Sequence, residues 1–147
     1  MDIFTGHPDW TMEILEDGTF GVLEYHGNDT VVTVPSEVCG TKVTKICDEA
    51  LSTWEEDISY EIEFKLGVIE KVIIPDTVTT IGFQAFAGCW NLREVVLPET
   101  ISSIQREAFF NCYRLKKINI LADCKVEDDA FLNCDFIEHG IPIDKRK

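Results

Sequence analysis

Basic residues are missing from the start of this chain, in which the first lysine or arginine is Lys42. The N-terminus also has no apolar run, so it has neither half of a classical export signal, and no segment is long and apolar enough to span a membrane. We therefore expect no membrane insertion, and a cytoplasmic location if the chain is complete. If the chain is a fragment, a secreted or cell-surface location is expected instead.

Motifs that carry catalytic or metal chemistry are also missing. The cysteines and histidines form neither a C-x2-C nor an H-E-x2-H pattern, and the chain has no glycine-rich phosphate loop and no G-x-S-x-G turn. Carboxylates are plentiful, but no nucleophile, acid and base are brought together by spacing. The sequence therefore predicts a protein that is not an enzyme and that uses neither a cofactor nor a metal.

Charge is distributed unequally along the chain, whose net charge is −14. Residues 1–64 contain 15 acidic and 2 basic residues, whereas residues 65–147 contain 12 and 11. A field of one sign steers partners of the opposite charge, and it disfavours nucleic acid, which needs a basic patch to neutralise its phosphates. The acidic half is thus either a docking surface for a protein with a basic surface or a device for solubility alone.

The second half of the chain follows a 23-residue repeat. One copy contains Pro75, Ile81, Ala85-Phe86, Cys89 and Leu92. The next copy contains Pro98, Ile104, Ala108-Phe109, Cys112 and Leu115. A third copy is one residue short and contains Ala130-Phe131, Cys134 and Ile137. A fixed period of this length predicts a solenoid, in which each copy stacks on the next and equivalent residues form ladders.

Each copy contains a segment that predicts a short strand. Residues 94–98 alternate inward and outward side chains and end at Pro98, which has no N–H to extend a ladder. Residues 71–75 and 117–120 are equivalent, so we expect parallel strands with the inward pairs Val72/Ile74, Val95/Leu97 and Ile118/Ile120. The Ala-Phe pair and the cysteine after it predict a short helical or 3₁₀ turn on the opposite side of the coil.

The N-terminal segment lies outside the repeat and predicts a cap. Asp17-Gly18 is a two-residue turn signal between residues 11–15 and 19–25, which predicts an antiparallel β-hairpin over the apolar end of the first coil. The chain is therefore expected to form a single domain. Its parts are a cap in residues 1–30, about four repeats in residues 31–140, and a frayed tail in residues 141–147.

Two insertions interrupt the looser repeats that precede residue 68. One lies between Pro35 and Ala50, and an acidic one lies near residues 52–67. Insertions in repeat proteins form loops on one face, which is often the binding face. In the second insertion, apolar residues at 58, 60, 62 and 64 alternate with polar ones, which predicts an additional strand.

These copies resemble the BspA-like leucine-rich repeats of bacteria and protozoa. The segments IIPDTVTTIGFQAFAGCWNL and VVLPETISSIQREAFFNCYRL match that pattern closely from Val68 to about Phe136, and the match is looser from Val31 to Leu51. The resemblance implies an α/β leucine-rich-repeat solenoid with short parallel strands, short helical or 3₁₀ turns and, here, an antiparallel β-hairpin as N-terminal cap. It also implies a binding scaffold, often on cell surfaces, without catalysis of its own.

Three cysteines share one repeat position and are expected to stack inside the solenoid: Cys89, Cys112 and Cys134. Neighbouring coils are about 4.8 Å apart, a separation at which a disulfide is geometrically allowed. A cysteine that is part of the repeat nevertheless favours packing as a buried free thiol. Cys39, Cys47 and Cys124 have no assigned role.

Two aliphatic residues, Ile73 and Val96, point outward from neighbouring expected strands. Together they form a modest apolar patch for binding, or they are ordinary exposed hydrophobic residues. The charges beside them alternate in sign from copy to copy, which predicts lateral ion pairs with an architectural role. The two series are Lys71, Glu94, Lys117 and Glu70, Arg93, Lys116.

Large aromatic residues complete the set of candidate binding residues. Trp90 and Tyr113 follow the repeated cysteine, where the repeat requires no apolar residue, and we expect their rings to stack on each other. Trp54 lies in the acidic insertion. Aromatic residues with a polar handle are enriched at binding hot spots. The alternative is that they shield the edge of the coil.

Three functions remain open. The favoured one is a non-enzymatic protein–protein interaction module that binds through Trp54, Ile73, Trp90, Val96 and Tyr113. The second is an adhesion domain of a bacterial or protozoan surface protein, which binds a host or matrix protein. The third is a self-associating structural protein, because an uncovered C-terminal coil presents an edge on which another copy stacks.

Overall fold

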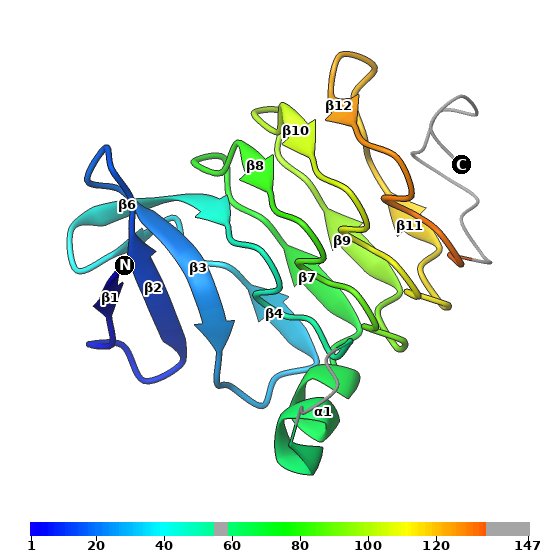
Figure 1. Cartoon of the computed structure of the whole chain (residues 1–147), viewed down its shortest axis with the longest axis horizontal. Coiled ribbons are helices and arrows are strands. Elements are labelled where there is room, and N and C mark those ends of the chain that lie inside the picture. Colours follow the sequence, from blue (N-terminus) through cyan, green and yellow to red (C-terminus); the bar gives the residue numbers. More distant parts are fainter. Residues whose placement is uncertain (55–58, 135–147) are drawn as a thin grey trace.

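The computed structural model describes residues 1–54 and 59–134. They form a solenoid whose coils follow one another behind an N-terminal cap (Figure 1). This confirms the predicted leucine-rich-repeat solenoid. The predicted limits of the domain remain predictions, and Ile137 and the tail of residues 141–147 lie outside the described residues.

The predicted parallel strands form a four-stranded sheet along one side of the solenoid. Its strands, in spatial order, are β11 (Lys117–Ile118), β9 (Glu94–Val96), β7 (Lys71–Ile73) and β4 (Val31–Thr33). All three junctions are parallel. The three predicted inward pairs are buried, as alternation requires.

A second parallel ladder, which the repeat pattern did not predict, runs along another side of each coil. It consists of β6 (Thr41–Ile46), β8 (Thr80–Ile81), β10 (Ser103–Ile104) and β12 (Lys125–Val126). The repeated Ile81 and Ile104 point inward from it and are buried. Two-residue strands are too short to show alternation, so periodicity could not reveal them.

The Ala-Phe segments form consecutive turns rather than the expected helical or 3₁₀ turns. The Ala85 N–H donates to the Gly82 carbonyl (3.2 Å), and the Ala87 N–H donates to the Gln84 carbonyl (3.1 Å). Gln84 itself has a positive φ of 52°, as do its counterparts Glu107 (55°) and Asp129 (59°). A left-handed residue cannot continue a right-handed helix, so each turn ends at once.

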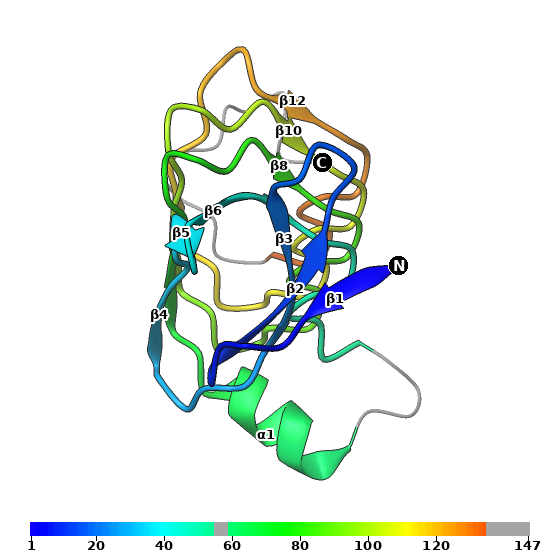
Figure 2. The same ribbon diagram turned by 90° about the vertical axis from the view of Figure 1, so that its left-hand side faces the viewer.

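The cap is antiparallel, as predicted, but has one more strand. The hairpin joins β2 (Trp10–Ile14) to β3 (Phe20–Tyr25), and β1 (Asp2–Phe4) pairs with the outer edge of β2. β3 then pairs in parallel with β6, which links the cap to the second ladder. Figure 2 shows the cap strands lying across the end of the coil. The cap therefore covers the apolar end of the first coil.

The first insertion is a small hairpin. β5 (Glu37–Val38) pairs antiparallel with the start of β6. The turn between them consists of Cys39 and Gly40, with φ values of 49° and 82°. Two positive φ values are what a tight two-residue hairpin needs, and glycine at the second position adopts its value without steric cost.

The second insertion contains a helix, α1 (Tyr60–Gly67), so the predicted additional strand is wrong. The Ser59 hydroxyl caps the helix by accepting the Ile62 N–H (3.3 Å). Glu61 and Glu63 lie in the first turn and Lys65 in the last, which favours a helix through its dipole. These helix signals outweigh the alternating pattern, because a strand is stable only when a partner strand beside it pairs with its backbone. Ile58 lies outside the described residues.

One predicted series of ion pairs is confirmed. Glu94 is bracketed by two lysines, with Oε1 3.5 Å from Lys71 Nζ and Oε2 3.7 Å from Lys117 Nζ. In the other series, the described residues show no ion pair between Glu70 and Arg93. Their backbones are joined instead, because the Arg93 N–H donates to the Glu70 carbonyl (2.7 Å).

Candidate binding surface around helix α1

Trp90 lies beside α1 rather than against Tyr113. No ring contact between Trp90 and Tyr113 occurs among the described residues, so the expected stack is wrong. The Trp90 ring has the guanidinium of Arg114 5.8 Å from its centroid, and its Nε1 edge faces the backbone of Gly67. Helix α1 was not predicted, and it brings a different neighbour to the indole. Trp90 and Tyr113 are still both exposed, by 44% and 43%.

Trp54 lies on the turn side of the coil, apart from Trp90. Its ring is 5.2 Å from that of Phe110, two coils along. Two hydrogen bonds hold this part of the insertion: the Ser52 hydroxyl accepts the Trp54 N–H (3.0 Å), and the Thr53 hydroxyl donates to the Gly88 carbonyl (2.6 Å). Trp54 remains 54% exposed, so the ring shields Phe110 and also presents a surface.

Ile73 and Val96 lie side by side on the outer face of the four-stranded sheet. They are register partners in β7 and β9, and both are half-buried. The next residue outward along this row is Thr33 of β4, which pairs with Ile73. The apolar patch is thus two residues wide. Of the five candidate residues, only Ile73 and Val96 are thus register partners, while Trp90 lies against α1 and Trp54 against Phe110.

The first coils contain a pocket that no sequence pattern predicted. Its volume is about 390 Å³, and α1 forms one wall with Tyr60, Glu63, Phe64 and Gly67. These four residues share one face of the helix because they are spaced by three or four. The facing wall contains Trp90 and Asn91. The lining is completed by Val68, after the helix, and by Thr30 and Glu70, just before β4 and β7 begin. Figure 1 shows α1 beside these strand starts. We call this the aromatic pocket.

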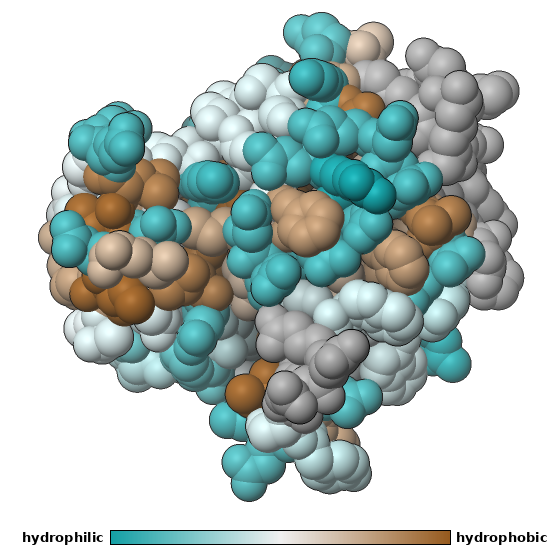
Figure 3. All heavy atoms as spheres, in the orientation of Figure 1, coloured by the Kyte–Doolittle hydropathy of each residue, from teal (hydrophilic) through white to brown (hydrophobic). Residues whose placement is uncertain are grey.

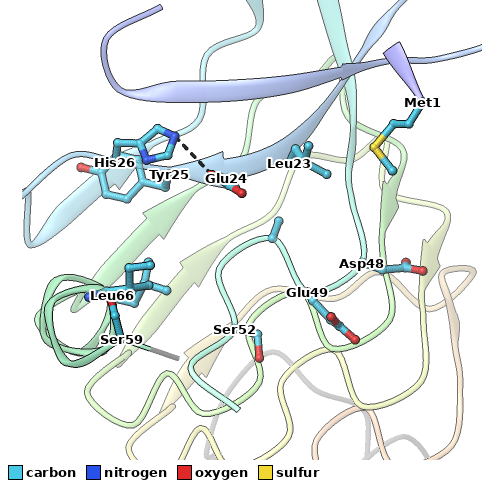
Figure 4. Close-up of a pocket in the computed structure, with 12 residues that line it drawn as sticks. Met1, Leu23, Glu24, Tyr25, His26, Asp48, Glu49, Ser52, Ser59 and Leu66 are labelled. Carbon is cyan, nitrogen blue, oxygen red and sulfur yellow. Dashed lines mark hydrogen bonds and ion pairs between the residues drawn. The ribbon is translucent and has the colours of Figure 1, made fainter. Parts of the chain in front are cut away.

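A second pocket, of about 500 Å³, lies on the opposite face of α1 (Figure 4). Leu66 and Ile62 line it from the helix, and carboxylates line it from β3 and from the turn after β6. These carboxylates belong to Glu24, Asp48 and Glu49. We call this the acidic pocket.

Tyr25, the last residue of β3, and His26, which follows it, also line the acidic pocket. The His26 Nε2 is 3.5 Å from Glu24 and 2.8 Å from the Thr11 hydroxyl. Burial raises the pKa of the Tyr25 hydroxyl, which donates weakly to Asp29 (3.4 Å). The hydroxyl is therefore protonated at neutral pH and acts as a structural donor in this wall.

The repeated cysteines are free thiols that donate to the backbone of the preceding coil. The Sγ atoms of Cys89, Cys112 and Cys134 lie 3.1 Å from the carbonyls of Leu51, Phe86 and Phe109, respectively. Burial raises the pKa of the Cys89 thiol to about 12 and that of Cys112 well above its usual value. Such thiols are neutral and inert at physiological pH. The expected packing as buried free thiols is confirmed for Cys89 and Cys112, whereas Cys134 is a free thiol that is only half-buried.

Cys47 is equally unsuited to nucleophilic chemistry. It is buried under the cap, and its Sγ donates to Glu13 Oε2 (3.3 Å). Burial and this hydrogen bond raise its pKa to about 12. In the described ranges, 1–54 and 59–134, no group of three or more His, Cys, Asp or Glu side chains is arranged to hold a metal ion.

Exposed apolar residues also gather on the cap. Figure 3 shows hydrophobic atoms concentrated over the cap strands at the left-hand end of the molecule. Met1, Ile3 and Ile14 are the exposed members, and they come from β1, β2 and the residue before β1. The sequence pattern predicted a cap here but not this exposed surface.

The family model that matches this chain is described as "BspA type Leucine rich repeat region (6 copies)", and it matches residues 57–142. The match covers more than half of the chain. The chain belongs to this family. The resemblance drawn from the repeat motifs is thereby confirmed, and the scaffold is that of the BspA-type leucine-rich repeat proteins.

Solved BspA-type and other leucine-rich repeat structures share this fold. A leucine-rich cell surface protein from Faecalibacterium prausnitzii is 25% identical, with a TM-score of 0.75 over 94% of this chain and 36% of its own. A leucine-rich repeat protein from Bacteroides ovatus is 26% identical, with a TM-score of 0.73 over 90% of this chain and 33% of its own. One from Bacteroides capillosus is 29% identical, with a TM-score of 0.70 over 92% and 98%.

This BspA-type chain therefore spans about a third of the first and second of these relatives and nearly the whole of the third. No curated protein is similar enough to the chain to count as a match. Within residues 1–54 and 59–134, no helix has the length and apolar character required to cross a membrane.

Proposed function

We propose that this chain is a non-enzymatic protein–protein interaction module whose binding surface is centred on α1 and Trp90. The observation that carries the proposal is the aromatic pocket, where Tyr60, Phe64 and Trp90 are exposed around one concavity. Clustered, partly exposed aromatic residues are characteristic of binding hot spots. The BspA-type scaffold supports this function because it holds such residues on a rigid frame.

The other candidate residues extend the proposed surface. Tyr113 occupies the repeat position of Trp90 one coil further, and Ile73 and Val96 lie on the outer face of the adjoining sheet. Trp54 on the turn side is a separate contact point. We propose that Trp90 and Tyr113 contribute most, because Trp90 lines the pocket, Tyr113 holds the equivalent position in the next coil, and both are large and exposed.

The test compares protein capture by the parent chain and by variants of each surface. Trp90→Ala combined with Tyr113→Ala is expected to lose a partner while the free energy of unfolding stays within about 1–2 kcal/mol of the parent. Two matched variants test the other surfaces. One combines Ile73→Ala with Val96→Ala on the sheet, and the other is Trp54→Ala on the turn side. Quantitative mass spectrometry of proteins bound to each immobilised chain gives the readout. The proposal fails if no captured protein depends on any of the three surfaces.

A location at the cell surface is proposed as the setting of this interaction. The supporting observation is the relative from Faecalibacterium prausnitzii, which is itself described as a cell surface protein. In that setting the module would act in adhesion, with a host or matrix protein as partner. Labelling of intact cells with an antibody against this chain distinguishes this location from a cytoplasmic one.

Self-association remains a separate proposal. The predicted contact at the C-terminal coil falls partly on residues 135–147, outside the described part of the chain. Sedimentation velocity over a wide range of protein concentration tests it directly. A mass that stays at that of a monomer up to about millimolar concentration contradicts a self-associating role.

A further inference from the structure

The aromatic pocket has the composition of a site for a cation. Its aromatic side chains are exposed by 81% for Tyr60, 63% for Phe64 and 44% for Trp90. Tyr60 and Phe64 are neighbours on one helical face, and Trp90 faces the same concavity from the repeat coils. The face of an aromatic ring carries negative charge density and attracts ammonium and guanidinium groups.

Carboxylates complete the pocket, and no basic residue neutralises them from within it. Glu63 lines it from α1 and Glu70 from the start of β7. None of the described lining residues is a lysine or an arginine. Among the described ion pairs, neither Glu63 nor Glu70 is a member. The surrounding half of the chain adds a field of the same sign, with 15 acidic and 2 basic residues in residues 1–64.

The chain itself shows that Trp90 accepts a guanidinium. Arg114 places its Cζ 5.8 Å from the centroid of the Trp90 ring, and its Nη1 donates to Asn91 Oδ1 (3.1 Å). Asn91 lines the pocket, whereas Arg114 does not. Two residues that line the pocket, Trp90 and Asn91, therefore already hold one guanidinium. It belongs to Arg114, which is not part of the pocket lining.

We propose that the aromatic pocket binds the arginine side chain of a basic, extended segment of a partner protein. This inference rests on the proposed interaction function and names the chemistry of its partner. The guanidinium packs against the exposed rings and pairs with Glu63 and Glu70. Arginine is preferred to lysine because a planar guanidinium stacks on aromatic rings and gives up its water more readily than an ammonium group.

Gly67 sets the width of the pocket and offers a way to change it. A Cβ at this position would lie 2.9 Å from the Trp90 Nε1 atom. Gly67→Ala must therefore push the indole away from the helix. If the pocket is the binding site, this substitution weakens binding although it removes no ring and no charge.

The experiment measures binding of short fluorescein-labelled peptides by fluorescence anisotropy. The probe has one central arginine between two lysines, with glycine and serine elsewhere. One matched peptide has citrulline in place of arginine, which keeps the shape and removes the charge, and another has lysine. The parent is expected to bind the arginine peptide with a dissociation constant below about 1 mM, and to bind the citrulline peptide at least about fivefold more weakly.

Variants of the chain locate the site. Phe64→Ala is expected to weaken binding about two- to thirty-fold, the range of a cation–π contact. Trp90→Phe is expected to keep most of the affinity and Trp90→Ala to lose it. Glu63→Gln with Glu70→Gln is expected to weaken binding about two- to tenfold and to reduce its dependence on salt. Ile62→Ala, on the opposite face of α1, is the matched control and is expected to bind as the parent does.

Nuclear magnetic resonance supplies a second readout that does not depend on a variant remaining folded. The arginine peptide is expected to shift the indole N–H signal of Trp90 and to leave that of the buried Trp10 in place. Equal binding of the arginine and citrulline peptides, or no binding at about 1 mM, overturns the inference. If a captured partner still depends on Trp90 and Tyr113 in that case, the proposed function stands and only its arginine chemistry is lost.

Discussion

The repeat array and the N-terminal half of this molecule differ in what their side chains do. In the array, Phe86, Phe109 and Phe131 stack at 5.2 and 5.3 Å with nearly parallel rings, and charges of both signs are balanced. In the N-terminal half the charge is almost all negative, and α1 leaves Tyr60 and Phe64 exposed.

This contrast shows where the fold is specified and where the surface is specialised. A residue in the array is constrained by equivalent residues on both sides, so a change there disturbs a ladder. The second insertion has no equivalent in the neighbouring coils. Leu66 anchors it in the core, whereas side chains such as Tyr60 and Phe64 stay exposed and available for contact. The two regions should therefore respond oppositely to substitution: the array should lose stability, and the insertion should lose binding.

The largest effect is expected from Phe109→Ala in the array. Phe109 is fully buried between two other phenylalanines, so its removal leaves a cavity and breaks two ring contacts. We expect unfolding in urea to require about 3–5 kcal/mol less free energy than in the parent. Phe64→Ala in α1 is the matched change of the same residue type, and it is expected to cost under about 1 kcal/mol. Similar losses for both variants would contradict the distinction between the two regions.

A smaller effect is expected from a glycine at the junction of array and insertion. Gly88 has a φ of 78°, and a Cβ there would clash with the Thr53 hydroxyl. Gly88→Ala is therefore expected to cost about 2–3 kcal/mol, from left-handed strain together with the displaced hydroxyl.

Gly18, in the hairpin of the cap, isolates the backbone part of this cost. Its φ is 84°, and nothing lies within 4 Å of an added Cβ. Gly18→Ala is expected to cost only about 1 kcal/mol, measured by the same denaturation experiment. If Gly88→Ala cost no more than Gly18→Ala, the packing of Thr53 against this coil would not contribute to stability.

The buried thiols predict a dependence of stability on pH. The folded-state pKa of Cys89 is about 12, above its ordinary value of 9.0, because burial disfavours the thiolate. Its contribution is fully present below the ordinary pKa and is lost as pH rises, since the unfolded thiol ionises first. Between about pH 8 and pH 10, we expect Cys89 to account for a loss of about 1.4 kcal/mol.

Comparison with Cys89→Ala isolates this contribution from that of other titrating groups. Urea denaturation of both chains at the two pH values gives the four free energies needed. The variant is expected to lose less stability than the parent over this range. An identical loss in the two chains would show that Cys89 is not protected from ionisation by the fold.

The smallest effect is expected from the exposed charges of the array. Glu94 pairs with Lys71 and Lys117 at 3.5 and 3.7 Å on the surface of the sheet. Glu94→Gln is expected to cost under about 1 kcal/mol, and high salt should abolish the difference from the parent. Thermal denaturation at low and high salt measures it. A larger, salt-independent loss would mean that Glu94 has a packing role beyond its charge.

Sequence and structure agree most closely where the chain repeats. Period, strand position, inward pairs and the stack of Phe86, Phe109 and Phe131 all follow from copies that must bury the same face. The second ladder was missed because strands such as β8 (Thr80–Ile81) have only two residues and show no periodicity. The turns were expected to be helical because nothing in the sequence reveals the positive φ at Gln84. Glutamine rarely adopts such a φ, so its presence gives no warning of one.

The candidate site was predicted only in part. Trp90 and Tyr113 were found as large aromatic residues at positions that the repeat does not constrain, but their partners were wrong. Tyr60 and Phe64 were assigned to a strand, which would have placed Ile62 on the same face as both. The helix instead turns Ile62 to the acidic pocket and leaves Tyr60 and Phe64 in the pocket that Trp90 lines. Ser59, Glu61 and Lys65 carried the signal for a helix, as an N-cap and an i,i+4 pair.

By itself, the sequence determined the solenoid, its parallel strands, its hairpin cap and the acidic character of its first half. These features depend on local periodicity, turn residues and composition, which neighbouring positions in the chain define. Only the tertiary structure decided that α1 lies against Trp90, that two pockets flank this helix, and that the indole faces Gly67. Those contacts join an insertion to a coil more than twenty residues away, and no repeat relates the two segments.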